Sequence, residues 1–130
     1  MSAGSPAATV LVDARNVLRS QWPNIPEAEV VSRAREWAAA EGVIAVVVFD
    51  GRAPEGLVGE RELDGGTVLV GTGAESADDW IARAAESLAA ERRPYWLVTS
   101  DRDLRARAGG AAERTIGGGA FADTLRPRPV

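Results

Sequence analysis

The chain alternates between short strand-like runs, most of them rich in β-branched apolar residues, and segments with helical periodicity. The strand-like runs cover residues 9–12, 43–49, 67–70, 94–99 and 113–116. Apolar runs of this length are typical of strands that are buried on both faces of a parallel sheet. Alternating strands and helices predict an α/β fold, because right-handed crossovers place the helices on the two faces of the sheet. We therefore expect one domain with a parallel sheet of about five strands and helices on both faces.

Two longer segments have the apolar spacing of amphipathic helices, residues 27–41 and 76–91. In each segment apolar side chains recur every three or four positions, which places them on one face of a helix. Gly42 is a natural end for the first helix, since glycine readily adopts the left-handed conformation that follows a helix. Shorter helical segments are predicted at residues 16–21, 101–108 and 120–125, and the glycine-rich residues 52–66 are predicted to form a loop.

The residue types that the chain lacks restrict its chemistry. None of the 130 residues is cysteine, histidine or lysine, and all 15 basic residues are arginine. This composition excludes disulfides, thiolate zinc sites, cysteine nucleophiles, imidazole bases, Schiff bases and the P-loop lysine. Catalysis would therefore have to use carboxylates, hydroxyls, Asn, Arg and a borrowed cation. Because the formal net charge is −4, binding to nucleic acid would depend on a local arginine surface.

The sequence also indicates where such a domain lies and where it would work. No stretch approaches the roughly 20 apolar residues of a membrane span, and residues 1–8 lack the apolar core of a signal peptide. We expect a cytoplasmic protein without membrane contact. The domain is expected over residues 9–125, between a disordered N-terminal tail at 1–8 and a C-terminal tail at 126–130.

Three strand-like runs lead into an aspartate, namely Asp13, Asp50 and Asp101. In a parallel sheet the C-terminal strand ends share one edge, and ligands bind there. Asp78 and Asp79 open a helix at that same edge, so the carboxylates should converge. Clustered like charges are costly without a counter-ion, and oxygen ligands without His or Cys favour Mg²⁺ or Mn²⁺. The alternative for each single aspartate is a turn or a helix N-cap.

The two neighbouring acids of the second long helix can be given different roles. Ser76 followed three residues later by Asp79 fits a capping box, in which a serine N-cap and an acid bond each other's backbone. That pattern gives Asp79 a structural role and leaves Asp78 for a metal.

The same pattern occurs after the fourth strand-like run, from Ser100 to Asp103. If Asp103 is the acid of this box, Asp101 is the better metal ligand, with Asp103 in a structural or supporting role. The hydroxyls of Thr99 and Ser100 could hold a metal-bound water, or they could simply cap the end of the strand.

Several stretches resemble, in the same order, motifs of the NYN domain of YacP-like proteins, which is a PIN-like domain. The stretch Leu-Val-Asp-Ala-Arg-Asn-Val-Leu resembles that family's opening "VDGYNVL". The stretches concerned are residues 11–18, 48–51, 76–81, 98–104 and 118–125, so the resemblance spans nearly the whole chain. It implies a PIN-like domain with a parallel sheet, an acidic Mg²⁺ site and endoribonuclease activity.

The resemblance also assigns roles to individual residues. Carried over to this sequence, Asp13, Asp78 and Asp101 would be the catalytic and metal-binding acids. Asp50 would be a further metal ligand, and Asn16 would support the site. The implied reaction is hydrolysis of RNA phosphodiester bonds, in which a cation activates water and neutralises charge on the phosphate.

One departure from the family pattern lies beside the first aspartate. The family's Gly-Tyr is Ala14-Arg15 in this sequence, which removes a glycine and an aromatic ring that could stack on a base. Arg15 could instead contact phosphate. Together with Arg52, Arg102 and Arg105 it lies near the expected active edge, where these side chains could position the RNA backbone or remain solvated.

Other α/β proteins that collect aspartates at this edge fit less well. Receiver domains and haloacid-dehalogenase-type phosphatases both use a lysine, which this chain lacks, and the phosphatases also need an Asp-x-Asp pair where Asp13 is followed by Ala14 and Arg15. The alternative that remains open is a non-catalytic PIN-like module that binds RNA, the ribosome or a protein. Metal-dependent cleavage of RNA would distinguish the two.

Overall fold

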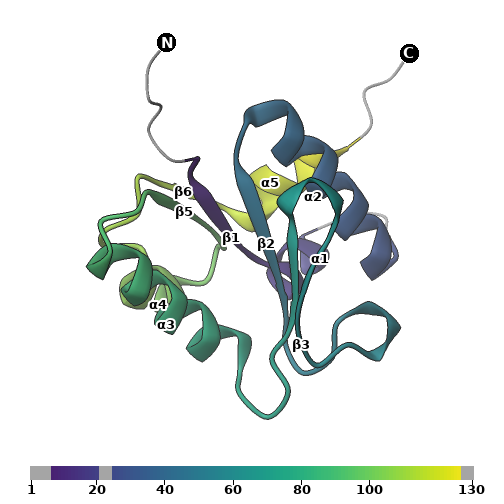
Figure 1. Ribbon diagram of the computed structural model, residues 1–130, viewed down its shortest axis with the longest axis horizontal. Helices are drawn as coiled ribbons and strands as arrows, with labels where there is room; N and C mark the ends of the chain where they lie inside the picture. Colours follow the sequence, from purple (N-terminus) through teal and green to yellow (C-terminus); the bar gives the residue numbers. More distant parts are fainter. Residues whose placement is uncertain (1–6, 21–24, 127–130) are drawn as a thin grey trace.

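The computed structural model describes residues 7–20 and 25–126, and this part of the chain forms a six-stranded sheet between two layers of helices (Figure 1). The strand order is β3-β4-β2-β1-β5-β6. The strands are β1 (Thr9–Asp13), β2 (Ile44–Phe49), β3 (Gly59–Glu62), β4 (Val68–Gly71), β5 (Tyr95–Val98) and β6 (Arg114–Ile116). The α-helices are α1 (Ala14–Arg19), α2 (Glu27–Glu41), α3 (Ala77–Ala90), α4 (Arg102–Ala108) and α5 (Gly118–Leu125).

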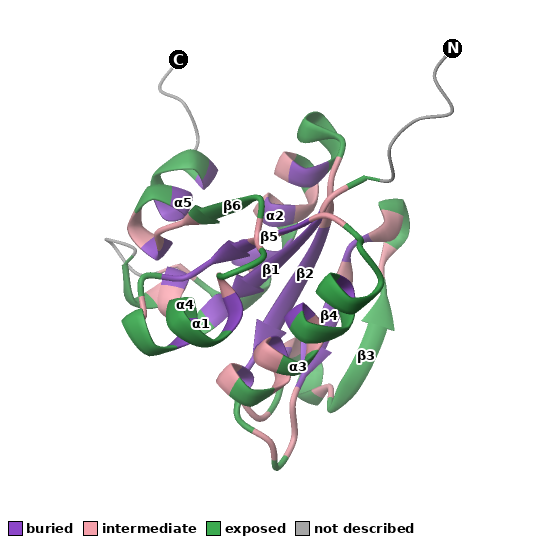
Figure 2. Ribbon diagram, turned by 90° about the vertical axis from the view of Figure 1, so that its left-hand side faces the viewer, coloured by how far each residue is buried: buried purple, intermediate pink, exposed green. Residues whose placement is uncertain are grey.

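The centre of the sheet is parallel, as the sequence pattern predicted. Strand β1 pairs in parallel with β2 and β5, while β4 and β6 extend the ladder on either side. Helices α3 and α4 pack on one face through one apolar cluster, and α1, α2 and α5 pack on the other face through two further clusters. Because both faces are covered, β1 is buried along its whole length (Figure 2). The α/β class and the two helical layers are therefore confirmed.

The prediction of a loop over residues 52–66 is wrong in its middle part. Residues Gly59–Glu62 form strand β3, which pairs antiparallel with β4 at the edge of the sheet. This adds a sixth strand to the predicted five and makes the sheet mixed. The residue pattern did not indicate this strand, because all four residues are exposed and none has an apolar side chain. Charged side chains on an edge strand also discourage pairing with another chain.

The ends of the helices follow from their capping residues. Helix α2 has the predicted bounds, and Gly42 ends it in the left-handed conformation with φ of 71°. Helix α1 begins two residues before the predicted start, since Asp13 is its N-cap. The predicted end of that helix at residue 21 lies outside the described residues, as do residues 1–6 and 127–130 of the two predicted tails. Among the helices of the described ranges, none combines the length and the apolar character that a membrane span needs.

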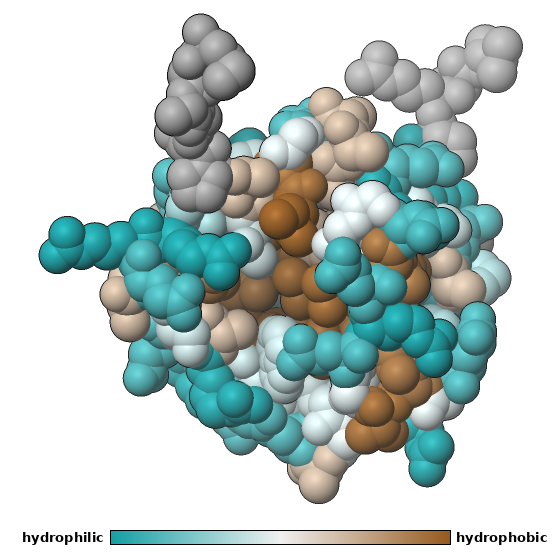
Figure 3. Space-filling model, in the orientation of Figure 1, coloured by the Kyte–Doolittle hydropathy of each residue, from teal (hydrophilic) through white to brown (hydrophobic). Residues whose placement is uncertain are grey.

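Few large hydrophobic side chains are strongly exposed, although several are half-buried at the surface. Among the described residues, Val58 is the only large hydrophobic residue that is exposed, with 55% of its surface accessible. Figure 3 shows hydrophilic side chains over most of one face, with hydrophobic surface gathered near its middle. The polar groups at the C-terminal ends of the strands are therefore the better candidates for a functional site.

Candidate functional site

The C-terminal ends of the central strands open onto a cavity of about 210 Å³ that is rich in aspartate. Asp13 is the last residue of β1, Asp50 follows β2, Asp78 lies in the first turn of α3, and Asp101 precedes α4. The cavity is lined by Asp13, Arg15, Arg19, Asp50, Ser76, Ala77, Asp78 and Asp101. The parallel sheet thus brings four aspartates that are distant in sequence to one place. Their roles in metal binding and catalysis stay predictions.

Asp13 is the most deeply buried of the four, with 5% of its surface accessible. Its Oδ1 accepts a hydrogen bond from the backbone N–H of Asn16 (3.4 Å), and its Oδ2 accepts one from the Thr99 hydroxyl (3.1 Å). Burial raises the pKa of Asp13, and repulsion from Asp78 adds to the rise, while the two hydrogen bonds and the nearby Arg19 oppose it. Asp13 is therefore an oriented carboxylate that is costly to ionise.

Asp78 is partly buried and faces the other cavity acids. Burial is the largest cause that raises the pKa of Asp78, and repulsion from Asp101 and Asp50 raises it further, against the attraction of Arg107. Repulsion of this kind is expected where carboxylates share a site without a counter-ion. A cation in the cavity would remove it.

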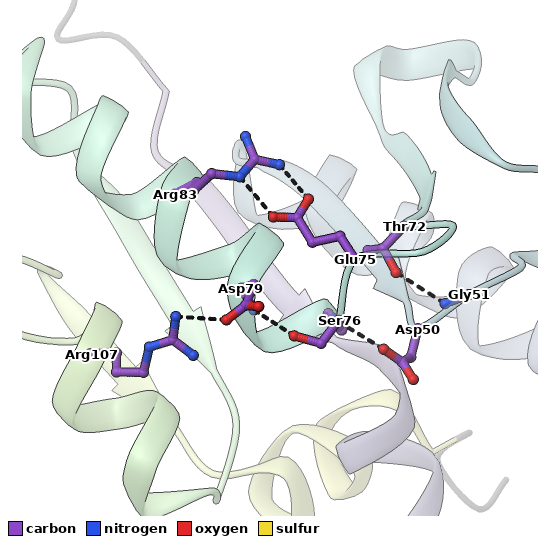
Figure 4. A network of polar contacts seen from close by, with 9 residues as sticks. Asp50, Gly51, Thr72, Glu75, Ser76, Asp79, Arg83 and Arg107 are labelled. Atoms are coloured by element: carbon purple, nitrogen blue, oxygen red, sulfur yellow. Dashed lines mark hydrogen bonds and ion pairs between the residues drawn. The ribbon is translucent and has the colours of Figure 1, made fainter.

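Asp50 and Asp101 each use one carboxylate oxygen to hold a helix. Oδ1 of Asp50 accepts from the backbone N–H of Ala77 (2.9 Å) at the start of α3 (Figure 4). Oδ1 of Asp101 accepts from the backbone N–H of Leu104 (3.0 Å) as the N-cap of α4. No donor from the described residues bonds to the second oxygen of either group. Structural capping and ligand binding are therefore compatible in the same side chain.

The structure separates Asp79 from Asp78. Ser76 is the N-cap of α3, and its hydroxyl accepts from the Asp79 backbone N–H (3.0 Å). The Asp79 carboxylate forms an ion pair with Arg107 of α4 (2.8 Å), which lowers the pKa of Asp79 (Figure 4). Asp79 does not line the cavity, whereas Asp78 does.

The predicted capping box at residues 100–103 is wrong. The N-cap of α4 is Asp101 and not Ser100. Ser100 is engaged elsewhere, because its hydroxyl accepts from the backbone N–H of Gly118 (2.8 Å) and its own backbone N–H donates to Oδ1 of Asn16 (2.9 Å). Asp103 is exposed and does not line the cavity.

Thr99 connects two of the cavity acids. Thr99 is completely buried, and its hydroxyl donates to Oδ2 of Asp13. The hydroxyl oxygen of Thr99 in turn accepts from the backbone N–H of Asp101 (3.1 Å). Thr99 therefore fixes the end of β1 against the start of α4. Its predicted contact with a metal-bound water, like that of Ser100, stays a prediction.

Asn16, Ser100 and Gly118 form a junction between α1, the β5–α4 loop and α5. Gly118 is buried there, and a Cβ atom at this position would lie 2.0 Å from Oδ1 of Asn16. The junction thus needs a glycine because the Asn16 amide occupies the space of a side chain. It holds the loop that carries Asp101 close to α1.

We expect Gly118→Ala to lower the stability of the protein by about 1–3 kcal/mol, the usual cost of overpacking a buried position. The added methyl group must displace the Asn16 side chain and weaken its bond to Ser100. Thermal denaturation would measure the loss. Gly119→Ala is the matched control, since its added Cβ would meet only the Cβ of Ser20, at 3.9 Å. Equal losses in both variants would contradict this explanation.

Of the arginines expected at the active edge, only Arg15 lines the cavity. Arg105 donates to the Thr99 carbonyl (2.9 Å), while Arg52 and Arg102 are exposed and do not line it. Arg19, which was not predicted, also lines the cavity. Its position four residues after Arg15 is the signal that could have revealed it, once the helix is known to begin at Ala14.

The oxygen donors around the cavity are of the type that a divalent cation requires. Within residues 7–20 and 25–126, no three acidic side chains are grouped closely enough to hold a metal ion as they stand. The chemistry nevertheless fits, because four carboxylates surround one cavity and hard cations prefer oxygen ligands. Burial is the main cause of the raised pKa values of Asp13 and Asp78, and such a cation would relieve the repulsion between acids that adds to it.

Comparison with known proteins places this cavity in a broader context. The family described as "YacP-like NYN domain" matches residues 10–124, a range that includes all four cavity aspartates. The crystal structure of Rae1 (YacP) from Bacillus subtilis is similar, with a TM-score of 0.65 and 20% sequence identity over 90% of this chain and 72% of that one. A point mutant of the same protein gives a TM-score of 0.68 and 18% identity over 91% and 74%. No curated protein matches the sequence.

Proposed function

Because the chain belongs to the YacP-like NYN domain family, we propose that it is a metal-dependent endoribonuclease that hydrolyses RNA phosphodiester bonds at the acidic cavity. The family is a PIN-like nuclease family, which supports a nuclease function related to RNA. The observation that carries the proposal is the convergence of Asp13, Asp50, Asp78 and Asp101 on one cavity at the C-terminal edge of the sheet.

These four aspartates would hold Mg²⁺ or Mn²⁺, with Asp13, Asp78 and Asp101 as the catalytic acids. When bound, a divalent cation supplies an activated water and neutralises charge that builds on the phosphate. The rest of the chemistry depends on how the chain positions its carboxylates. The buried Thr99 hydroxyl donates to the carboxylate of Asp13 and accepts from the backbone N–H of Asp101, so little reorganisation is needed at these two residues when substrate arrives.

Supporting residues hold the acids in place. Asn16 links α1 to the β5–α4 loop by accepting a hydrogen bond from the Ser100 backbone N–H, and Asp79 links α3 to α4 through its ion pair with Arg107. We propose that these contacts keep Asp78 and Asp101 at a fixed separation. RNA is the proposed substrate, and Arg15 is the arginine of the predicted set that lies where it could meet the RNA backbone.

A second candidate function is a non-catalytic PIN-like module that binds RNA, the ribosome or a protein. The observation that favours it is that, in the described part of the chain, the acids surround the cavity without forming a ready group of three around one point. In that case the carboxylates would have only a structural role. Asp13, Asp50 and Asp101 already have one, since each accepts from a backbone N–H at the start of a helix.

Incubation with mixed single-stranded RNAs tests the proposal. We expect internal cleavage in the presence of Mn²⁺ or Mg²⁺, complete inhibition by EDTA, and recovery when excess Mn²⁺ is added back. Gel electrophoresis of end-labelled RNA distinguishes internal products from stepwise trimming. RNA that is bound but stays intact in every metal would reject the nuclease and favour the binding module.

A further inference from the structure

Helix α1 directs two arginines to the acidic cavity. Its buried face consists of Ala14 and Val17, which pack into the core. Arg15 and Arg19 lie on the exposed face, four residues apart, so their side chains are neighbours on the helix surface. Both line the cavity that holds the four aspartates. The packing of α1 therefore determines where these guanidinium groups lie.

Neither guanidinium forms a hydrogen bond or a close ion pair with the described residues, although Arg19 lies near enough to Asp13 to lower the pKa of that carboxyl. Most other arginines there are bound to a carboxylate, a carbonyl or a ring, as in the pairs of Arg33 with Glu29 and Arg107 with Asp79. Arg15 and Arg19 form no such contact with the described residues, although acidic side chains line the same cavity. The acids are held elsewhere: Asp13, for example, accepts its bonds from Asn16 and Thr99.

An anion other than a protein carboxylate could accept hydrogen bonds from these two guanidinium groups. Guanidinium groups present several N–H donors in a plane and bind phosphate oxygens in pairs, with more geometric specificity than an ammonium group. Two of them one helical turn apart can approach a single phosphate from two sides. A local cationic surface is also required, since a chain of net charge −4 repels a polyanion elsewhere.

We infer that Arg15 and Arg19 together bind one phosphate of the sugar-phosphate backbone of a nucleic-acid strand at the rim of the acidic cavity. The inference rests on the proposed function, because it places that function's substrate in the same cavity. It makes recognition at this point depend on the backbone and not on base identity. Since RNA and DNA share the phosphate, the contact adds affinity without distinguishing them.

Binding of a fluorescently labelled 12-nucleotide single-stranded RNA of mixed sequence tests the inference. Anisotropy would be measured from 50 to 200 mM NaCl, once with EDTA and once with Ca²⁺. For Arg15→Gln/Arg19→Gln we expect the Kd at low salt to rise roughly tenfold, and the slope of log K against log salt to fall by about 0.7, the value for one phosphate contact on a single strand. The same labelled DNA should lose affinity by the same factor.

Arg92→Gln/Arg93→Gln is the matched control. It removes the same charge from exposed residues between α3 and β5, at the opposite edge of the sheet, and should change Kd less than about twofold. Arg15→Lys/Arg19→Lys keeps the charge but loses the planar donors, so the salt slope should stay while affinity falls. Thermal denaturation of each variant confirms folding.

The outcomes separate this inference from the proposed function. Unchanged affinity and salt slope in Arg15→Gln/Arg19→Gln, or a control that loses as much, would overturn the phosphate contact even if the protein cleaves RNA. Wild-type protein that binds no oligonucleotide in either buffer would overturn it as well. A selective loss of binding in a protein that cleaves nothing would uphold the contact and reject the nuclease.

Discussion

Asp101→Asn is expected to lower the rate of RNA cleavage by about a hundredfold or more, since loss of a residue that merely positions a metal ligand already costs 10–100-fold. The substitution removes the negative charge but keeps an oxygen in the same place. Asparagine is as good an N-cap as aspartate, so the bond from the Leu104 N–H can persist and α4 should remain folded. The loss of activity would then report on charge at the cavity and not on structure.

Initial rates with Mn²⁺, measured beside circular dichroism and thermal denaturation, would check this result. Asp123→Asn is the control, because Asp123 is an exposed acid of α5 that does not line the cavity. It should cleave at the wild-type rate. Equal cleavage by Asp101→Asn and the wild type would point to a contaminating nuclease, and the catalytic role of this acid would be rejected.

The fold was predictable where burial controls the pattern. The apolar runs of β1 and β2 and the spacing along α2 and α3 reflect positions that must be removed from water, and the structure has these elements close to the expected bounds. Strand β3 was not predictable in this way. Its Gly-Glu-Arg-Glu sequence lies at an edge, where hydrogen bonds to β4 hold a strand that buries no side chain.

The candidate site shows the same limit. The convergence of the four aspartates follows from the parallel sheet, because strand ends have a common edge regardless of their separation in sequence. The error at residues 100–103 came from a choice between Ser100 and Asp101, which are both good N-caps. Contacts with distant residues determine which of the two is the N-cap, because Ser100 is hydrogen-bonded to Asn16 and Gly118. The sequence around residues 100–103 cannot indicate those contacts, because the partners lie far away along the chain.

Mn²⁺ is expected to raise the melting temperature of the wild-type protein. A ligand that binds only the folded state, at a hundredfold excess over its Kd, stabilises by about 2.7 kcal/mol, or roughly 10 °C for a domain of this size. The physical reason is that the cation neutralises carboxylates that repel one another in the cavity. Ca²⁺ is expected to stabilise in the same way without supporting cleavage. Differential scanning fluorimetry with and without each metal would measure the shift.

Two neighbouring acids provide the decisive comparison. Asp78→Asn should leave the metal-free protein as stable as the wild type or slightly more stable, because repulsion from Asp101 and Asp50 is lost, and it should abolish most of the metal-dependent rise. Asp79→Asn should instead destabilise the metal-free protein slightly, through loss of its ion pair with Arg107, and keep the response to metal.

The pH dependence of the two variants should have opposite signs. Since the folded-state pKa of Asp78 is raised above its ordinary value of 3.8, its contribution to stability is fullest below that value and is lost as pH rises through the raised pKa. The pKa of Asp79 is lowered by Arg107, so its contribution is present at neutral pH and is lost as the solution is acidified. Any gain from Asp78→Asn should thus be visible at pH 7 and vanish in acid, whereas the loss from Asp79→Asn should be largest at pH 7.

The response to metal decides which acid is the ligand. If Asp79→Asn abolishes the metal-dependent rise in melting temperature and Asp78→Asn retains it, the structural and metal-binding roles of the two acids are reversed. If the wild type does not respond to metal at any pH, the cavity is no metal site, and the binding module becomes the better explanation of its four acids.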